Sequence, residues 1–392
     1  MGAISWTSML PLIVVTSLFV YDEWVSAPSC KTLPGLDRRQ HDPVTDSDDL
    51  KVMMVANLLL LGSEAGFVNR YFRDYYMAKF FRKSFHTVNL DMLLVLGDVS
   101  AKGSELTRKR WLTMLNQFHQ MLGPFLGLPF HVVLGDRDVG ECGRLEAKSV
   151  DWIAGNFPGL DTAGCGAFEI SNVSFVSLNT VVLLCGNNKL RFGVEKVIES
   201  ENIDLRMDSK GTAKTINDFS KFSESYHDFT WRENAMSPSS GPVLLLHFPL
   251  HRTVDNMCSQ ISNTRESRGF SGPRPYDLLQ TLPPNATEYI FQALKPRIIF
   301  SAHTHKFCDH THSDGTREVT VSAMTWKVRD DPGFVVATFH GNGRVSVSYC
   351  SLARESHLLI AYTSVLVLLL SIILIPNIPW YVCMAMILCN YM

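Results

Sequence analysis

The stretch FHVVLGDRD, residues 130–138, shows the pattern from which the fold of this 392-residue chain can be argued. A short apolar run that ends in Gly-Asp is typical of a buried strand followed by a turn, because both residues favour turns for backbone reasons. The same pattern stands upstream, where residues 92–98 read MLLVLGD. A single Gly-Asp pair is most often only a turn, so the interpretation depends on the residues at the ends of the other apolar runs.

Three more apolar runs lead into polar residues: KVMMVA (51–56) before Asn57, VLLL (243–246) before His247, and RIIF (297–300) before His303 and His305. A lone His-x-His is more often a pair at a strand end than a set of ligands. In open α/β sheets, however, ligands bind beyond the carboxyl ends of the strands, so side chains in these positions converge. The five runs together therefore predict one site.

The elements between these runs predict an α/β domain over residues 51–350. Helices are expected at 71–84, 104–122 and 147–156, a hairpin at 166–170 and 173–178, and further β structure at 317–349. Strands that alternate with helices indicate a parallel sheet with crossover connections. Residues 186–241 are polar and lysine-rich, so we interpret them as a partly helical insertion that leaves the core.

Composition argues against a nucleic-acid partner and for a membrane. The formal net charge of −2 gives no basic surface of the kind that binds nucleic acid. The apolar fraction of 46% is high for a soluble enzyme, and a hydrophobic segment near each end of the chain accounts for the excess.

The first hydrophobic segment lies within residues 1–21, which predict a signal anchor or a signal peptide. Its apolar run at residues 9–20 is short for a spanning helix, and no Lys or Arg precedes it. Val25 and Ala27 have the spacing of a cleavage site, but Pro28 would follow the cut. We therefore favour an uncleaved anchor, followed by a linker at 22–50.

The second hydrophobic segment, residues 358–375, reads LLIAYTSVLVLLLSIILI and carries no charge. At about 1.5 Å per residue, its length is close to the thickness of the hydrocarbon core of a membrane, so we expect a transmembrane helix. Pro376 and Pro379 then interrupt the helix, and the short apolar tail at 376–392 is expected to lie at the membrane interface.

Different features of the sequence favour opposite sides of the membrane for the domain. Lys and Arg flank the hydrophobic segments on the domain side, which weakly favours the cytosol. The sequons at Asn172 and Asn285, and seven of the nine cysteines outside the hydrophobic ends, favour the lumen of the secretory pathway. An odd number of cysteines cannot all pair internally, and Cys308 with Cys350 is one possible disulfide among many.

In their order along the chain, the strand ends resemble those of the calcineurin-like metallophosphoesterases. The pattern of that family is D-x-H, G-D, G-N-H-[DE], H and G-H-x-H. The stretches LLLHFPLHR (244–252) and SAHTHKFCDHTH (301–312) look like its membrane-anchored branch. The resemblance covers roughly residues 50–375 and implies an α/β/β/α sandwich of two sheets, with a dinuclear metal site at the strand ends.

The resemblance implies that the ligands of one metal are retained. Asp98 falls where the family has the carboxylate that bridges both metals, and Asp136 falls where it has the Asn of G-N-H. His247 and His303 take the two imidazole positions of this metal, and His305 belongs to the other. Mn, Fe or Zn would suit such ligands.

The other metal site has lost ligands. Where D-x-H is expected the chain has Asn57-Leu58-Leu59, so Asn57 offers one weak carbonyl oxygen and Leu59 offers nothing. A second metal is therefore expected to be weak or absent. Arg137 replaces the catalytic His, and a guanidinium cannot act as a general acid near neutral pH, although it can clamp a phosphate.

Two functions are consistent with this pattern. The first is a membrane-bound, metal-dependent phosphoesterase in the ER or Golgi with a lumenal domain. The membrane-anchored branch includes a phosphodiesterase that removes ethanolamine phosphate from glycosylphosphatidylinositol (GPI) anchors. Its substrate would be a phosphodiester on a membrane lipid or GPI glycan, and its action would aid ER-to-Golgi transport of GPI-anchored proteins. The alternative is a weakened or inactive relative that binds a phosphorylated lipid or cargo protein.

Two further histidines, His310 and His312, follow the last of the candidate ligands and are expected to be solvated loop residues.

Overall fold

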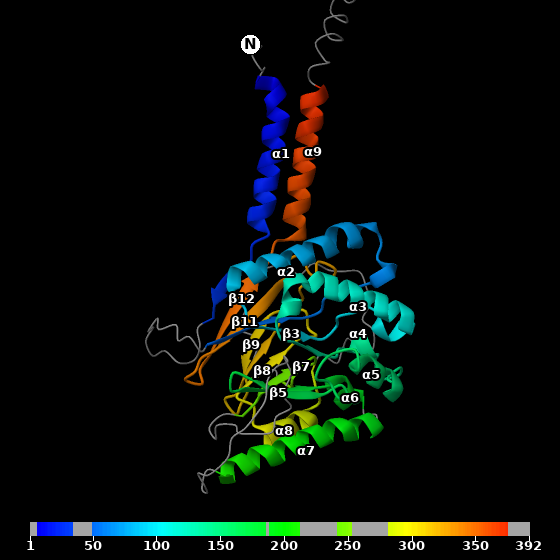
Figure 1. Ribbon diagram of the computed structural model, residues 1–392, viewed down its shortest axis with the longest axis vertical. Helices are drawn as coiled ribbons and strands as arrows, with labels where there is room; N and C mark the ends of the chain where they lie inside the picture. The colour runs from blue at the N-terminus through cyan, green and yellow to red at the C-terminus, as the bar shows by residue number, and fades with distance from the viewer. Residues whose placement is uncertain (1–5, 34–48, 186–187, 212–240, 253–280, 375–392) are drawn as a thin grey trace, which may run out of the picture.

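The computed structural model describes residues 6–33, 49–185, 188–211, 241–252 and 281–374, and Figure 1 shows an α/β body from which two helices project. Within these residues the body has two six-stranded sheets. The first has the order β1-β12-β11-β2-β3-β4, and the second has the order β5-β6-β7-β8-β10-β9.

The strands that lead into the site run parallel to one another in both sheets. The first sheet contains β1 (Ser29–Thr32), β2 (Leu50–Val55), β3 (Met92–Leu96), β4 (Phe130–Val133), β11 (Gly333–Phe339) and β12 (Val345–Ser351). The second contains β5 (Gly166–Ile170), β6 (Val173–Leu178), β7 (Val243–Leu246), β8 (Ile298–Ser301), β9 (Cys308–Thr311) and β10 (Arg317–Thr320). Strands β2, β3 and β4 are parallel, as are β6, β7 and β8.

Alternate side chains of the strands pack into two separate cores, which shows that the sheets lie face to face. Val52 and Met54 of β2 pack in the same cluster as Val243 and Leu245 of β7, so this cluster lies between the sheets. The neighbouring residues of both strands join a second cluster that contains the apolar faces of the helices. Because successive side chains of a strand point to opposite faces, both faces of each sheet are covered. The predicted α/β sandwich of two sheets is confirmed.

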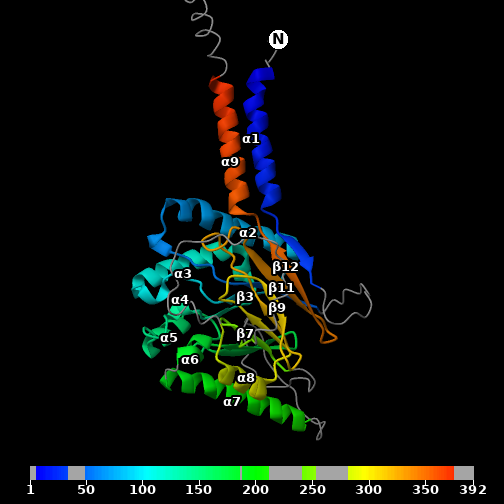
Figure 2. The same ribbon diagram turned by 180° about the vertical axis from the view of Figure 1, so that it is seen from behind.

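The helices lie on the outer faces of the sandwich. Their bounds are α2 (Asp74–Val88), α3 (Arg108–Leu122), α4 (Asp136–Val139), α5 (Ala147–Ala154), α6 (Thr180–Cys185), α7 (Asn188–Gly211) and α8 (Pro284–Leu294). Short helical turns are η1 (Gly62–Glu64), η2 (Asn69–Arg73), η3 (Gly103–Glu105) and η4 (Gly123–Gly127). In Figures 1 and 2, α2 and α3 lie near the projecting helices, and α7 and α8 lie at the opposite end of the body.

The element boundaries differ from the sequence prediction mainly at helix starts. The helix expected from residue 71 begins at Asp74, after the π-helical turn η2, and ends at Val88. The helix expected from residue 104 begins at Arg108, because Thr107 is extended and a separate 3-10 turn precedes it. Within the predicted insertion, α7 is helical as expected, but the prediction that this segment leaves the core is wrong for α7, because its buried apolar side chains belong to the second cluster. Residues 212–240 lie outside the described residues.

The two projecting helices are α1 (Trp6–Val25) and α9 (Glu355–Leu374), which lie side by side in both views (Figures 1 and 2). In the described part of the chain, only α9 is long and apolar enough to cross a membrane, over Glu355–Ile372. This supports a membrane segment at the C-terminal end. The anchor in residues 1–21 stays a prediction, and the tail at 376–392 lies outside the described residues.

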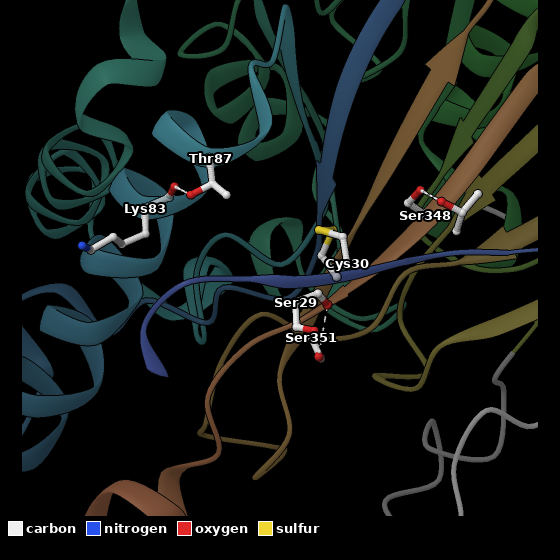
Figure 3. The surroundings of a disulfide bond; sticks show 8 residues. Ser29, Cys30, Lys83, Thr87, Ser348 and Ser351 are labelled. Carbon is white, nitrogen blue, oxygen red and sulfur yellow. Dashed lines mark hydrogen bonds between the residues drawn. A yellow bond between two sulfur atoms is a disulfide. The ribbon is translucent and has the colours of Figure 1, made fainter. Parts of the chain in front are cut away.

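Disulfides join segments that are far apart in the chain. Cys30 of β1 pairs with Cys350 of β12, so the two strands that adjoin α1 and α9 are linked covalently (Figure 3). Cys142 pairs with Cys185, and Cys165 is free and buried. The pairing of Cys308 with Cys350 is therefore wrong, although Cys308 is itself disulfide-bonded.

An aromatic cluster attaches the foot of α9 to the body. The indole of Trp326 packs between the rings of Phe72 and Phe80, with centroid distances of 5.5 Å to each. Its Nε1–H donates a hydrogen bond of 2.9 Å to the carbonyl of Ala353, two residues before α9. The same side chain thus contacts η2, α2 and the start of the projecting helix.

We predict that Trp326→Ala destabilises the body by about 3–5 kcal/mol, the usual cost of removing a large buried aromatic side chain. Thermal unfolding of the full chain in detergent would measure the effect. Phe192→Ala is the matched control, because the Phe192 side chain on α7 is 70% exposed. Equal shifts in melting temperature for both variants would contradict the role given to Trp326.

Candidate metal centre

The candidate site lies where the carboxyl ends of four strands meet. Asp98 follows β3 and Asp136 follows β4 in the first sheet, while His247 follows β7 and His303 follows β8 in the second. Because these strands are parallel within each sheet and the sheets pack face to face, their ends meet at one edge. Each sheet therefore contributes one half of the site.

Three of the predicted ligands form a group that one metal ion could bridge. The Oδ1 atom of Asp136 lies 2.9 Å from His247 Nε2 and 3.2 Å from His303 Nδ1. One ligand atom from each of these residues lies within 4.8 Å of the others. Asp98 is adjacent, with its Oδ1 atom 3.5 Å from His247 Nε2. A carboxylate pair with two imidazoles suits Mn, Fe or Zn.

The His247 ring is oriented by the backbone of the other sheet. Its Nδ1 atom lies 2.8 Å from the carbonyl oxygen of Leu96, so Nδ1–H donates and Nε2 faces the carboxylates. Gly97 makes this approach possible, because a Cβ atom there would lie 2.2 Å from His247 Nδ1. Gly97 also has a φ of +88°, which favours glycine.

The two oxygens of Asp98 have different surroundings. Oδ1 accepts a hydrogen bond of 3.1 Å from the backbone N–H of Arg137 and faces His247. Oδ2 is buried and has no hydrogen-bond partner in the described part of the chain, but it lies 3.5 Å from Nε of the Arg137 side chain. The carboxylate therefore points one oxygen toward the retained ligand group and the other toward a guanidinium.

The segment with the lost ligands runs beside Asp98. The Asn57 backbone N–H donates to the Gly97 carbonyl at 3.1 Å, and the Leu59 N–H donates to the Asp98 carbonyl at 3.0 Å. Both side chains are buried, and neither polar atom of the Asn57 amide has a hydrogen-bond partner among the described residues. His305 lies outside the close group of Asp136, His247 and His303, and its buried Nδ1 atom likewise has no partner.

The backbone of the site is unusual in a way that the sequence does not reveal. Asn57, Leu59, Asp98, His303 and His305 all have positive φ angles, between +53° and +61°. Such conformations cost free energy for residues other than glycine and tend to cluster at functional sites. The surrounding structure holds these five residues in place, which indicates that the positions of their side chains matter.

Buried charge shifts the ionisation of the ligand group. Burial lowers the pKa of His247, but the charges of Asp98 and Asp136 outweigh this effect and raise it to about 9. Burial also raises the pKa of Asp136, but hydrogen bonds to His247 and His303 bring it well below its usual range. The pKa of Asp98 is raised, first by burial and then by the charge of Asp136. The carboxylates thus attract positive charge into the centre.

A divalent cation fits the residues that are present. The close group offers one carboxylate oxygen and two imidazole nitrogens, a set of donor atoms that divalent metals accept. The His247 ring is already oriented for Nε2 to bind a cation. Asp98, Asp136, His247 and His303 would hold the ion.

One residue of the site was not assigned a role from the sequence. Asp138 is fully buried and accepts hydrogen bonds from the backbone N–H groups of Gly135 at 3.0 Å and Ser100 at 2.8 Å. It thereby ties the loop after β4 to the loop after β3. Asp138 falls at the last, acidic position of the G-N-H-[DE] pattern, and this was the sequence signal that could have identified it.

His310 and His312 are not solvated loop residues, so that prediction was wrong. Both are buried, and His312 Nε2 lies 2.8 Å from Glu318 Oε2. Glu318 also accepts hydrogen bonds from Ser301 Oγ at 2.6 Å and the Leu250 N–H at 3.2 Å. The pairing of β9 with β10 brings these residues inside, and this cluster supports the strand ends that carry His247 and His303.

Comparison with known proteins identifies a family to which this chain is similar. The family model described as Calcineurin-like phosphoesterase matches residues 70–307. Metallophosphoesterase 1 of Xenopus laevis is 25% identical over 94% of this chain and 87% of its own length. The corresponding proteins of Rattus norvegicus (27% identical, 83% and 77% covered) and Drosophila melanogaster (a homolog, 24% identical, 92% and 91% covered) are also similar.

Solved structures that this chain matches include a dimetal phosphatase from Danio rerio, with a TM-score of 0.41, 12% identity, and coverage of 74% of this chain and 93% of that one. A purple acid phosphatase from yellow lupin has a TM-score of 0.42 and 12% identity, with 80% and 55% covered. The family model spans well over half of the chain. The chain therefore belongs to the calcineurin-like phosphoesterase family, whose members are metal-dependent hydrolases of phosphoester bonds.

Proposed function

We propose that the chain is a membrane-attached phosphodiesterase that works with one tightly held divalent metal ion and turns over slowly. The observation that carries this proposal is the asymmetry around Asp98. On one side, Asp136, His247 and His303 form a compact ligand group. On the other side, the partner of Asp98 is the Arg137 guanidinium, beside the ligand-poor segment of Asn57 and Leu59.

The chemistry rests on what each group can do. A bound divalent metal supplies Lewis-acid polarisation of a phosphoryl oxygen and lowers the pKa of water. The Leu96 carbonyl keeps the His247 ring in the tautomer that presents Nε2. The Arg137 side chain is 42% exposed, so its outer nitrogens can bind a phosphate while Nε remains near Asp98. The Arg137 guanidinium cannot protonate the leaving group, because it does not give up a proton near neutral pH, and turnover is slow as a result.

The proposed substrate is a phosphodiester presented at a membrane, such as ethanolamine phosphate on a GPI glycan. The apolar helix α9 supports attachment to a membrane, and the similarity to the curated metallophosphoesterases supports the class of bond. Removal of that group in the ER or Golgi would aid the transport of GPI-anchored proteins. The loss of ligands at positions 57 and 59 supports a second candidate, a protein that binds a phosphorylated lipid or cargo protein without cleaving it.

A lumenal position of the body is part of the proposal. Disulfides form and persist in oxidising compartments, and Cys30–Cys350 and Cys142–Cys185 both lie in the body. Asn172 is exposed at the tip of the β5–β6 hairpin, and Asn285 is exposed at the start of α8. Both acceptor asparagines are therefore on the surface, where a glycan can be accommodated.

We predict that the protein binds about one metal ion tightly, because only one compact ligand group is present among the described residues. Elemental analysis after extensive dialysis would measure the metal content per chain. His303→Ala should remove the ion, whereas the matched His305→Ala should leave most of it. Two equivalents that survive dialysis would show that the ligand count is wrong.

We predict that the triple variant Asn57→Asp, Leu59→His and Arg137→His binds a second metal ion and turns over a model phosphodiester at least about tenfold faster. The reason is that it restores two ligands and a general acid, and general acids typically contribute about 100-fold or more. The double variant that keeps Arg137 is the control, because it should gain metal without gaining the acid.

Two results would contradict this explanation of weak activity. The first is turnover by the unmodified protein at the rate of family members with complete sites. The second is a triple variant that binds two metal ions and stays inactive. The second result would make the non-catalytic candidate the better account.

We predict that both Asn172 and Asn285 are glycosylated when the full chain is expressed in a secretory host. Glycosidase treatment should increase gel mobility, and Asn172→Gln and Asn285→Gln should each remove one step of that shift. Unchanged mobility for the wild-type chain would remove the main support for a lumenal body.

A further inference from the structure

A ridge of exposed apolar side chains surrounds η2 and the first turn of α2. It consists of Phe67, Val68, Tyr71 and Tyr75, which we refer to as the aromatic ridge. The side chains of Phe67 and Tyr71 are 79% and 63% exposed, and their rings lie 4.9 Å apart. Contiguous exposed apolar side chains on a protein body usually mark a contact surface.

The aromatic ridge is fixed to the foot of α9. Arg73 of η2 makes a bidentate ion pair with Glu355, the first residue of α9, at 2.6 and 3.1 Å. One turn further along, the hydroxyl of Tyr76 lies 2.8 Å from that of Tyr362. In Figures 1 and 2, α2 crosses the body at the foot of α9, on the side from which α1 and α9 project.

This attachment sets the height of the aromatic ridge relative to the apolar part of α9. The first exposed apolar side chains of α9 are Leu359 and Ile360, which lie between the two residues that contact η2 and α2. A membrane crossed by α9 therefore begins close to the level of the aromatic ridge. Tyrosine, with its apolar ring and polar hydroxyl, is enriched at this boundary.

A groove opens beside the same side chains, between α2 and α3. Its volume is about 580 Å³, and Tyr71, Tyr75 and the exposed Arg70 contribute to its walls. Its floor is polar, since Gln117 Nε2 donates to Asp74 Oδ2 at 2.8 Å. Apolar side chains on the rim, a cation on the wall and a polar floor suit a lipid headgroup that carries a phosphate.

The groove is connected to the metal centre. Lys327 Nζ lies 3.2 Å from Asp74 Oδ1 and donates a hydrogen bond of 2.8 Å to the carbonyl of Leu59. The ammonium is largely buried, and this makes the link rigid. The Lys327 ammonium therefore joins the first residue of α2 to the segment that runs beside Asp98.

We propose that the aromatic ridge seats the body on the membrane that α9 crosses, with its side chains in the headgroup layer and a phospholipid headgroup held by Arg70 in the groove. This inference rests on the proposed membrane attachment through α9. The membrane is the occupant that the geometry favours, because the ridge is continuous with the foot of α9. Seating would fix the tilt of the body and hence the height of the metal centre above the membrane.

The test places a photoreactive phenylalanine analogue at position 67 of the full chain and, as a matched control, at position 192. Both positions hold an exposed phenylalanine, but position 192 lies on α7 at the opposite end of the body. The chains are reconstituted in nanodiscs of phosphatidylcholine and phosphatidylserine, irradiated, and analysed for lipid adducts by mass spectrometry. We expect lipid adducts at position 67 and none at position 192.

A second variant tests the role of Arg70. Arg70→Gln should reduce the yield of phosphatidylserine adducts at position 67 about fivefold, since one cation near an anionic surface contributes roughly that factor. Lys189→Gln, which removes an exposed cation from α7, should change nothing.

Two outcomes would overturn the inference, and they are distinguishable. Adducts at position 67 that contain protein instead of lipid, or equal lipid adducts at both positions, would show that the ridge is not a membrane seat even though the chain stays in the membrane. Release of the chain from membranes by alkaline carbonate would overturn the proposed attachment itself, and the inference with it.

Discussion

The contact between the His247 imidazole and the Leu96 carbonyl is the one on which the site depends, because it joins the two sheets at the edge where the ligands lie. One partner belongs to a strand of the first sheet and the other follows a strand of the second. Glycine at position 97 leaves the space for the ring, and the ring in turn directs Nε2 toward Asp98 and Asp136. A shift of either sheet by a fraction of a residue would separate the carboxylates from the imidazoles, so the packing between the sheets is also the scaffold of the metal centre.

The sequence predicted those features that depend on residues close together in the chain, and it did not predict contacts between distant elements. The strands at 92–96 and 243–246 are continuous apolar runs with polar residues just beyond their ends, so both the sheet and the candidate ligands Asp98 and His247 were accessible. The contacts of Asp138, Lys327 and His312 were not accessible, because their partners lie on other elements and only the folded chain brings them together. The positive φ angles of Asn57 and Leu59 were equally hidden, because neither residue type requires them.

The replacements at positions 57, 59 and 137 form a consistent set once their places are known. Loss of a second cation would leave the outer oxygen of Asp98 buried without a counter-charge, which is costly in a low-dielectric interior. The Arg137 side chain supplies that charge from the solvent side, 3.5 Å from Oδ2. Leu59 is buried, so an apolar side chain there packs where an imidazole would need a partner. The guanidinium thus places a positive charge beside the oxygen of Asp98 that faces away from the close group of Asp136, His247 and His303.

The disulfide between β1 and β12 has a mechanical consequence. It closes a loop of 320 residues at the point where α1 and α9 leave the body. A lateral force that pulled the two helices apart would be carried by a covalent bond, and the hydrogen bonds of the sheet edge would bear little of the load. By the usual loop-entropy relation, a closed loop of this length also disfavours the unfolded chain by about 5–6 kcal/mol. If the body unfolded transiently, the disulfide would still hold its two ends together, and the chain would refold from this linked state.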